Sequence, residues 1–283
     1  MGLTRLVFLT TLTMVAFAAN SLLCRFALRE THLDAASFTS IRLMSGAVTL
    51  VLLISVRQRE RISGLIRPAG NTLSALALFT YAATFSFGYI ELSASTGALL
   101  LFATVQTTMI GYGLWAGERL RLWQWVGFVL AISGLVLLLF PGLSAPPWFE
   151  ALLMIFAGVS WGIYSVRGKG SREPLKDTAG NFIRTVPFTL LLSLVMLSQY
   201  QWDNSGFLYA LASGALASGL GYALWYSVLP SLTATVASTI QLSAIVIAAI
   251  GGVVLLGEPV TLRLLLASST ILGGIGLVIW CRN

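Results

Sequence analysis

The chain has 283 residues, of which 57% are hydrophobic and 10% are charged. Because a soluble domain carries about 25% charged residues, this composition and a mean hydropathy of +0.88 indicate a protein that lies in a lipid bilayer. The net charge of +7 comes from short basic clusters between apolar runs, which is typical of membrane topology and gives no reason to expect a nucleic-acid partner.

Ten apolar runs are long enough to cross a membrane, since a spanning helix needs about 20 mostly apolar residues. No segment between them is long enough for a folded soluble domain. We therefore expect an all-α polytopic membrane protein. Its spans are predicted at approximately 5–28, 35–56, 72–91, 94–115, 122–140, 148–166, 178–199, 206–228, 233–256 and 261–281.

Lys and Arg residues are distributed unevenly between the two sides of this topology. With a cytoplasmic N-terminus, twelve of them fall in segments on the cytoplasmic side and two, Arg29 and Arg263, on the other side. Cytoplasmic loops carry an excess of Lys and Arg. We therefore expect both termini to be cytoplasmic.

An internal repeat relates the two halves of the chain. The stretch GLWAGERLRL at 113–122 returns as VVLLGEPVTL at 253–262, so that Gly117-Glu118 corresponds to Gly257-Glu258 at an offset of 140. Nearer the N-terminus the offset is 142, where Ile41-Arg42 corresponds to Ile183-Arg184. Ordered identities at a nearly constant offset indicate a duplication, with repeats at 1–141 and 142–283.

Each repeat holds five spans, and this odd number means that the second copy enters the membrane from the opposite side. Two inverted five-helix repeats (5+5) are then related by a pseudo-two-fold axis in the membrane plane. Many secondary transporters have this architecture, with a substrate site near the midplane between the repeats. The repeat therefore predicts transport by alternating access.

Ten spans, a 5+5 duplication and a Gly-Glu pair at the end of spans four and nine resemble the EamA branch of the drug/metabolite transporter superfamily. Trp161 and Tyr164 in span six, with several Tyr and Phe residues in span three, are most similar to YddG-type amino acid exporters. The resemblance implies export of aromatic and other neutral amino acids across a bacterial inner membrane. It also implies a central cavity lined by spans one, three, four, six, eight and nine.

Polar and aromatic side chains deep within spans are the candidates for substrate binding. Rings can stack on a substrate and attract its ammonium group, and amides can bind its polar groups without a fixed charge. The alternative is ordinary helix packing, which remains open for each residue. The candidates are Asn20, Tyr81, Phe85, Gln106, Trp161, Tyr164, Tyr222, Trp225, Gln241 and Ser243.

Four charged residues are candidates for gates or charge anchors. Arg42 and Arg184 lie seven or eight residues into their spans. Each either snorkels to the interface or anchors neighbouring helices, or else it holds a substrate carboxylate or binds gate carbonyls. Glu118 and Glu258 either act in gating, by capping helix starts or pairing with a loop Arg, or lie as solvated acids beside a glycine C-cap. For these two acids we expect the solvated arrangement.

The sequence contains no motif for metal or cofactor binding, ATP hydrolysis or another enzymatic reaction. The single histidine, His32, and two separate cysteines, Cys24 and Cys281, predict neither a metal site nor another cofactor. The chain has no GxxxxGK[ST] motif and no paired-acid, HExxH or Ser/His constellation at membrane depth, so neither ATP hydrolysis nor another enzymatic activity is expected.

The ten acidic residues all fall near span ends or in loops, which leaves no evident carboxylate relay for ion coupling. The expected partners are an amino acid substrate and the bilayer, and a monomer is expected rather than a dimer. The glycines of spans five and ten are interpreted as packing within the chain. The alternative function is export of another small metabolite or a drug by the same fold.

Overall fold

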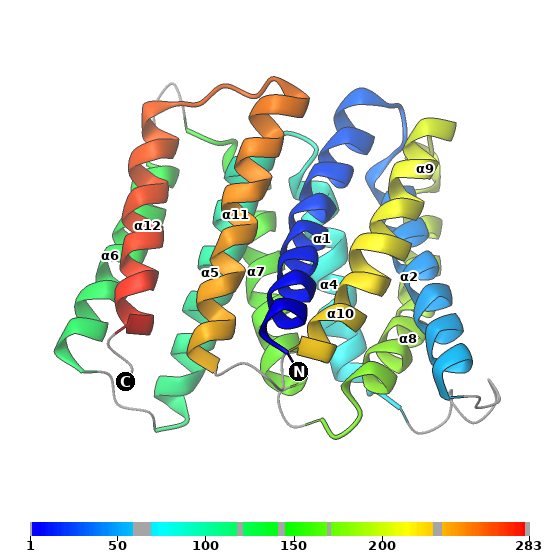
Figure 1. Ribbon diagram of the computed structural model, residues 1–283. Coiled ribbons are helices and arrows are strands. Elements are labelled where there is room, and N and C mark those ends of the chain that lie inside the picture. Colours follow the sequence, from blue (N-terminus) through cyan, green and yellow to red (C-terminus); the bar gives the residue numbers. More distant parts are fainter. Residues whose placement is uncertain are drawn as a thin grey trace.

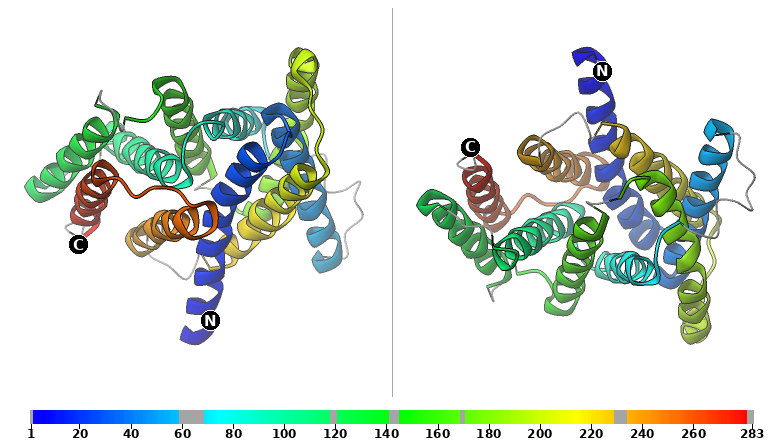
Figure 2. Two further views of the ribbon diagram at one scale, coloured as in Figure 1. Left: turned by 90° about the horizontal axis from the view of Figure 1, so that it is seen from above. Right: turned by 90° about the horizontal axis from the view of Figure 1, so that it is seen from below.

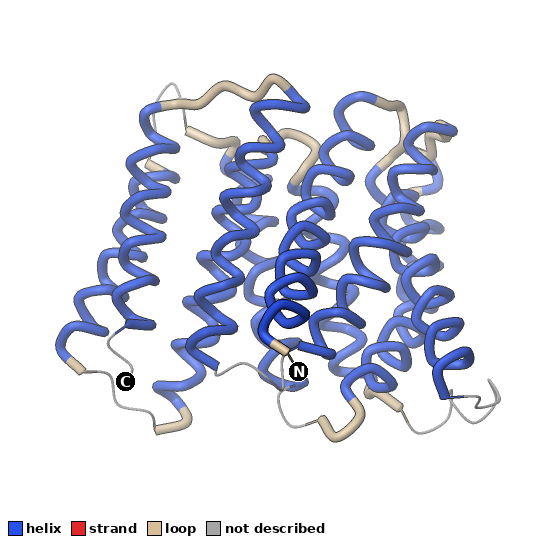
Figure 3. Tube along the Cα trace, viewed as in Figure 1, coloured by secondary structure: helices blue, strands red, loops and turns tan. Residues whose placement is uncertain are grey.

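The computed structural model describes residues 2–58, 69–117, 121–140, 145–168, 171–228 and 234–280. In these ranges it is helical and contains no strand (Figures 1 and 3). The helices are α1 (Leu3–Glu30), α2 (Ala35–Gln58), α4 (Thr72–Gly88), α5 (Ala94–Trp115), α6 (Leu122–Leu139), α7 (Trp148–Gly168), α8 (Pro174–Val195), the short 3-10 turn η1 (Leu197–Gln199), α9 (Asn204–Ala212), η2 (Ser213–Leu220), α10 (Gly221–Val228), α11 (Ala234–Leu256) and α12 (Leu262–Trp280).

The helices run up and down through one bundle, and α1 begins at the end of it where α12 finishes (Figure 1). We call this the terminal end and the opposite one the distal end. Within the described ranges, six helical segments are long and apolar enough to cross a membrane, and four more apolar helices are shorter. The prediction of an all-α polytopic protein is confirmed for the described residues, and the side on which the termini lie stays a prediction.

Helix limits follow the predicted spans closely, with the largest shift at span seven. That span was expected at 178–199, and α8 instead runs from Pro174 to Val195. Proline favours the first turn of a helix because its missing N–H is not needed there. The helix ends before a 3-10 turn at Leu197–Gln199.

The eighth span differs from the uninterrupted helix expected at 206–228. Its middle third, η2, is a π-helix between α9 and α10. Here Gly214 lies against α2 so closely that a Cβ would come within 1.9 Å of Ser45 Oγ and 2.2 Å of the carbonyl oxygen of Arg42. The Gly- and Ser-rich run at 213–219 thus brings two helices from different halves together at mid-bundle.

Helices α6 and α12 form a pair at one side of the bundle and pack mainly on each other (Figure 2). A Cβ at Gly134 would approach Ile271 to 2.6 Å, and one at Gly274 would approach the carbonyl oxygen of Gly127 to 2.5 Å. The expected close packing within the chain is confirmed at these glycines. Gly273 and Gly276 face open space instead.

Candidate functional site

A small central cavity lies between the two halves of the chain and has a volume of about 30 Å³. This is room for about one water molecule, so the rings around it are closed together in this conformation. The lining residues come from α1, α4, α5, α7, η2 and α10. They are Phe17, Asn20, Ser21, Tyr81, Phe85, Leu101, Phe102, Trp161, Ala217, Ser218 and Tyr222.

Trp161 occupies the centre of an aromatic cluster that joins both halves. Its ring lies 4.8 Å from that of Tyr81 in the first half, and it stacks on Tyr222 in the second half at 5.2 Å with an interplanar angle of 20°. The ring centroid of Phe17 lies 6.1 Å from that of Tyr222 and 5.9 Å from that of Trp225. Such ring pairs contribute about 0.5–1.5 kcal/mol each to stability beyond burial, so the cluster keeps the cavity small.

A polar network runs beside these rings and also connects the halves. The Tyr81 hydroxyl accepts hydrogen bonds from Arg42 Nη2 at 2.9 Å and from Asn20 Nδ2 at 3.3 Å. Asn20 Oδ1 in turn accepts one from Ser213 Oγ at 2.6 Å. The π-helical turn of η2 carries Ser213 and Ser218 into this network, and Ser218 Oγ accepts from Arg42 Nε at 3.3 Å.

Arg42 therefore does not snorkel toward the membrane surface, which was one of the interpretations offered by its sequence. Helix anchoring and carboxylate binding stay predictions. The residue exposure of Arg42 is 2%, and its guanidinium carbon lies 4.8 Å from the ring centroid of Phe85 and 5.1 Å from that of Tyr81. Helices α2, α4 and η2 surround it, which keeps the charge inside the bundle. Among described residues, nothing accepts a hydrogen bond from its Nη1 atom.

Arg184, the repeat mate of Arg42, lies in a different environment at the terminal end. Its Nη1 atom donates to the carbonyl oxygens of Ala69 and Gly180. Gly180 permits this contact, because a Cβ there would come within 2.1 Å of the Ala69 oxygen. Arg184 therefore ties α8 to the segment before α4 and stays at a distance from the central cavity's lining.

At the distal end Glu258 is buried, whereas the sequence led us to expect a solvated acid. Both carboxylate oxygens accept from the backbone N–H of Ala94, at 2.7 and 2.9 Å. Arg25 Nε lies 3.6 Å from Oε1 of Glu258, and its Nη1 donates to the carbonyls of Tyr89 and Ile90. The Glu258 carboxylate thus caps the N-terminus of α5, where the helix dipole is positive. The Arg25 guanidinium donates to backbone carbonyls just after the C-terminus of α4.

Backbone geometry brings Glu258 into this position. Gly257 adopts a φ of +61°, a left-handed conformation that favours glycine. The chain then turns so that the Glu258 N–H donates to the Gly252 carbonyl at 3.1 Å. A Cβ at Gly252 would come within 2.4 Å of Glu258 Oε2, so two glycines make room for one buried carboxylate.

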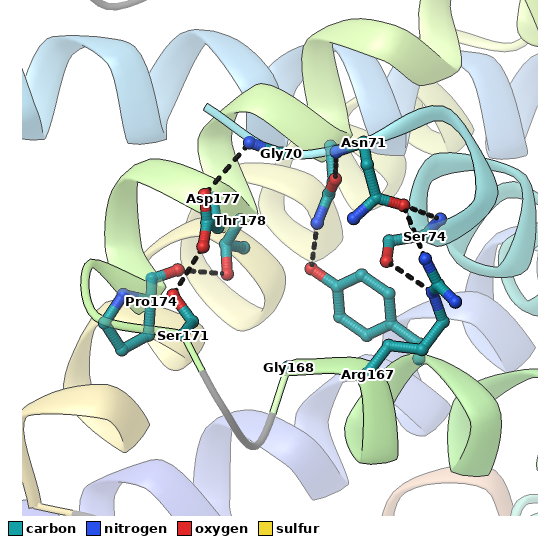
Figure 4. Close-up of a pocket in the computed structure, with 11 residues that line it drawn as sticks. Gly70, Asn71, Ser74, Arg167, Gly168, Ser171, Pro174, Asp177 and Thr178 are labelled. Atoms are coloured by element: carbon teal, nitrogen blue, oxygen red, sulfur yellow. Dashed lines mark hydrogen bonds between the residues drawn. The ribbon is translucent and has the colours of Figure 1, made fainter. Parts of the chain in front are cut away.

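A second, polar cavity of about 90 Å³ opens at the terminal end, where α4 begins, α7 finishes and α8 begins (Figure 4). Arg167 donates to Ser74 Oγ at 3.1 Å and to Asn71 Oδ1 at 3.0 Å. Tyr164 also lines this cavity, and its ring lies 5.5 Å from that of Trp161. These two rings therefore stand between the polar cavity and the central one.

The structure places the ten substrate candidates at different distances from the central cavity. Asn20, Tyr81, Phe85, Trp161 and Tyr222 line it. Tyr164 and Trp225 touch rings that line it. Gln106 is buried in α5, Gln241 is half-buried and Ser243 is exposed, and none of these three lines either cavity. Glu118, one of the gate candidates, lies outside the described residues.

Three residues that take part in these contacts were not predicted from the sequence. Phe17 and Ser213 are unremarkable in an apolar sequence, although the Gly- and Ser-rich run around Ser213 was a usable signal for a special contact. Arg25, which lies beside Glu258 at the distal end, was not among the candidates either. The repeat offset of 142 makes it equivalent to Arg167, and this was the available indication that it matters.

Comparison with known proteins agrees with this architecture. A model of the EamA-like transporter family matches the chain twice, over residues 4–140 and 148–280. An uncharacterized protein of Pseudomonas aeruginosa is 51% identical over 276 residues, which cover 97% of this chain and 94% of that one. The uncharacterized transporter YoaV of Bacillus subtilis is 24% identical over 84% of this chain and 85% of its own.

One solved crystal structure resembles the whole chain in fold, with a TM-score of 0.69 at 17% identity and full coverage of both chains. An uncharacterized transporter of Archaeoglobus fulgidus is 24% identical over 94% of either chain. The family model accounts for nearly the whole sequence in two parts, each with five helical spans. The chain therefore belongs to the EamA-like transporter family, a family of membrane transporters.

Proposed function

We propose that this protein exports amino acids, aromatic and other neutral ones, across a bacterial inner membrane by alternating access. The observation that carries the proposal is the composition of the central cavity. Asn20, Tyr81 and Phe85 from the first half meet Trp161 and Tyr222 from the second half around one small space. Rings of this kind stack on an aromatic side chain and attract an ammonium group, and the amide supplies hydrogen bonds.

The closed cavity supports a mechanism in which rings move before substrate binds. Ligand pockets for small molecules have about 300–1,000 Å³, whereas the central cavity has about 30 Å³. Trp161 is half-buried and lies between the rings of Tyr81 and Tyr222. Rotation of Trp161 out of this position opens the cavity and exposes the two faces on which an aromatic substrate stacks.

The two ends of the bundle support alternating access between repeats at 1–141 and 142–283. Glu258 of the second half holds Ala94 and Arg25 of the first half at the distal end. At the terminal end, the rings of Tyr164 and Trp161 separate a polar cavity from the central cavity. With cytoplasmic termini, as the Lys and Arg distribution predicts, this is a state closed to the outside, into which substrate comes from the cytoplasm.

The test is flux of radiolabelled amino acids into proteoliposomes. We expect saturable flux of phenylalanine, tryptophan, threonine or methionine, reduced at least about tenfold by Trp161→Ala through loss of the stacking faces. Trp148→Ala is the matched control, because Trp148 lies on the same helix with 76% of its surface exposed. Absence of flux for every amino acid, in folded protein, contradicts the proposal and favours a wider panel of metabolites and drugs.

Alternating access has a separate test at the distal end. In the double variant Ala94→Cys, Glu258→Cys on a background without Cys24 and Cys281, a short bifunctional maleimide joins the two halves across the closed end. The reference is the same double variant before cross-linking, because it already lacks the Glu258 carboxylate. Relative to this reference, we expect the cross-linked protein to lose flux and a cleavable cross-linker to restore it on reduction. Undiminished flux in fully cross-linked protein contradicts the mechanism.

A further inference from the structure

Arg42 is a buried cation for which the described residues supply no anion. It is the eighth residue of α2, it is 2% exposed, and it is among the largest fully buried side chains of the protein. No ion pair between described residues includes it, whereas Arg25, the other buried arginine, lies beside Glu258. A buried charge is stable only when it is paired or well hydrogen-bonded, so the missing partner calls for an explanation.

The contacts of Arg42 are neutral and incomplete. Nη2 and Nε donate to the hydroxyls of Tyr81 and Ser218, and the ring of Phe85 lies 4.8 Å from the guanidinium carbon. Nη1 is buried and finds no acceptor among the residues that the structure describes. Hydroxyls and rings orient the guanidinium without neutralising it, which leaves the group prepared to bind an anion.

This group adjoins the central cavity. All three of the residues that orient it, Tyr81, Ser218 and Phe85, are lining residues of that cavity. The described lining contains no Asp, Glu, Lys or Arg, so Arg42 supplies the dominant charge at this site. An anion in the opened cavity is therefore drawn toward Arg42, and a second cation is repelled from it.

The lining also decides which anion fits. A phosphate carries close to two charges and is usually held by several cationic groups or backbone N–H groups. One planar guanidinium matches the single charge and the geometry of a carboxylate. The remaining surface consists mostly of aromatic and apolar side chains, such as Phe17, Phe102 and Trp161, which favour an aromatic or apolar body.

We propose that Arg42 anchors the carboxylate of the transported solute, and that the substrate class is aromatic and apolar monocarboxylates in general. The α-ammonium group of an amino acid is then dispensable, because Arg42 meets the carboxylate and no described lining residue carries a negative charge for the ammonium. This inference rests on the proposed transport function and deepens it. Hydroxy acids with the same side chain are carried as well as amino acids.

Three matched solutes distinguish the contribution of the carboxylate to transport from that of the ammonium group. Phenylalanine has both, 3-phenyllactate replaces the ammonium by a hydroxyl, and phenylalaninamide replaces the carboxylate by a neutral amide. In proteoliposomes corrected for leak through protein-free liposomes, we expect 3-phenyllactate to have a KM within about threefold of that of phenylalanine. Phenylalaninamide should be transported at least about tenfold less efficiently, because it lacks the charge-assisted bonds to Arg42.

Variants at Arg42 supply a second readout that a purely structural arginine does not give. Arg42→Met removes an uncompensated buried charge, so we expect a higher melting temperature without ligand and at least about tenfold loss of transport of both carboxylates. Arg42→Lys retains the charge and should keep part of the activity. Arg184→Gln is the matched control at the repeat-equivalent position, and it should leave the preference among the three solutes unchanged.

The outcomes distinguish this inference from the proposed function. Phenylalanine and phenylalaninamide flux of equal efficiency, or a preference unchanged in Arg42→Met, overturns the inference and leaves amino acid export standing. Stabilisation of purified protein by 3-phenyllactate against unfolding, in wild type but not in Arg42→Met, supports the inference. Flux of 3-phenyllactate that is lost in Arg42→Met, without any flux of phenylalanine, supports Arg42 as the carboxylate anchor and contradicts amino acid export. A melting temperature lowered by Arg42→Met with solute preference retained identifies a structural role and overturns the inference.

Discussion

Both carboxylate oxygens of Glu258 lie within 2.9 Å of the backbone nitrogen of Ala94, although 164 positions separate the two residues in the chain. Glu258 follows span nine, and Ala94 is the first residue of span four. The contact therefore joins the two halves at the distal end, and Arg25 supplies the countercharge at 3.6 Å. Among the described residues, this carboxylate therefore links the two halves at the distal end, and its substitution tests the link.

Glu258→Gln should loosen the distal end. Removing one partner of a buried ion pair costs about 3–5 kcal/mol, and every 1.4 kcal/mol is tenfold in an equilibrium. Cys24 is fully buried next to Arg25 in α1, so its reaction with a maleimide reports opening. We expect labelling at least about tenfold faster in purified protein that carries Cys281→Ser.

The control for this measurement is Glu30→Gln, an exposed acid that pairs with Arg29 at the same end of α1. Exposed ion pairs contribute about 0–1 kcal/mol to stability, so the rate at which Cys24 is labelled should change little in Glu30→Gln. Equal labelling rates in Glu258→Gln and in the parent protein would contradict the assignment of Glu258 as the closing residue.

Gly252→Ala should reproduce the effect of Glu258→Gln through shape alone. The added Cβ would lie 2.4 Å from Glu258 Oε2 and 3.3 Å from the Cβ of Ala94, which forces the carboxylate out of its position. Because both substitutions break one contact, their effects on Cys24 labelling should be strongly non-additive in the double variant. Gly273→Ala, where nothing lies within 4 Å of the new Cβ, is the control.

Gly214→Ala should separate η2 from α2. A Cβ there would overlap Ser45 Oγ and the Arg42 carbonyl oxygen, at 1.9 and 2.2 Å. Overpacking of this kind destabilises a protein by about 1–3 kcal/mol, and displacement of η2 also moves Ser218 away from Arg42. Unfolding of the purified protein measures the loss. Gly111→Ala, at a site with open space, should be close to neutral.

Tyr81→Phe should weaken both stability and substrate binding. The substitution leaves Arg42 Nη2 and Asn20 Nδ2 without their shared acceptor, and a buried donor without a partner costs about 1–3 kcal/mol. We expect a lower melting temperature and a higher KM for any carried carboxylate. Tyr200→Phe, at an exposed tyrosine outside the helices, serves as the control. Unchanged stability in Tyr81→Phe argues against this network.

The sequence by itself determined the helical spans of this protein. Span length follows from the thickness of the bilayer, and apolar runs are read directly from composition. The two Gly-Glu pairs also mark helix ends at which glycine has a positive φ, at Gly117 and Gly257. A helix commonly ends with glycine in this conformation. These features are local, and a local physical rule is enough to predict them.

Only the tertiary structure decided what the charged residues do. Arg42 and Arg184 are equivalent in the repeat, yet one is buried beside the central cavity and the other binds backbone carbonyls at the terminal end. Glu258 was expected in solvent and is enclosed by α1, α5 and its own turn. The environment of a charge depends on neighbours that are distant in the chain, and packing of helices across the two halves supplies those neighbours.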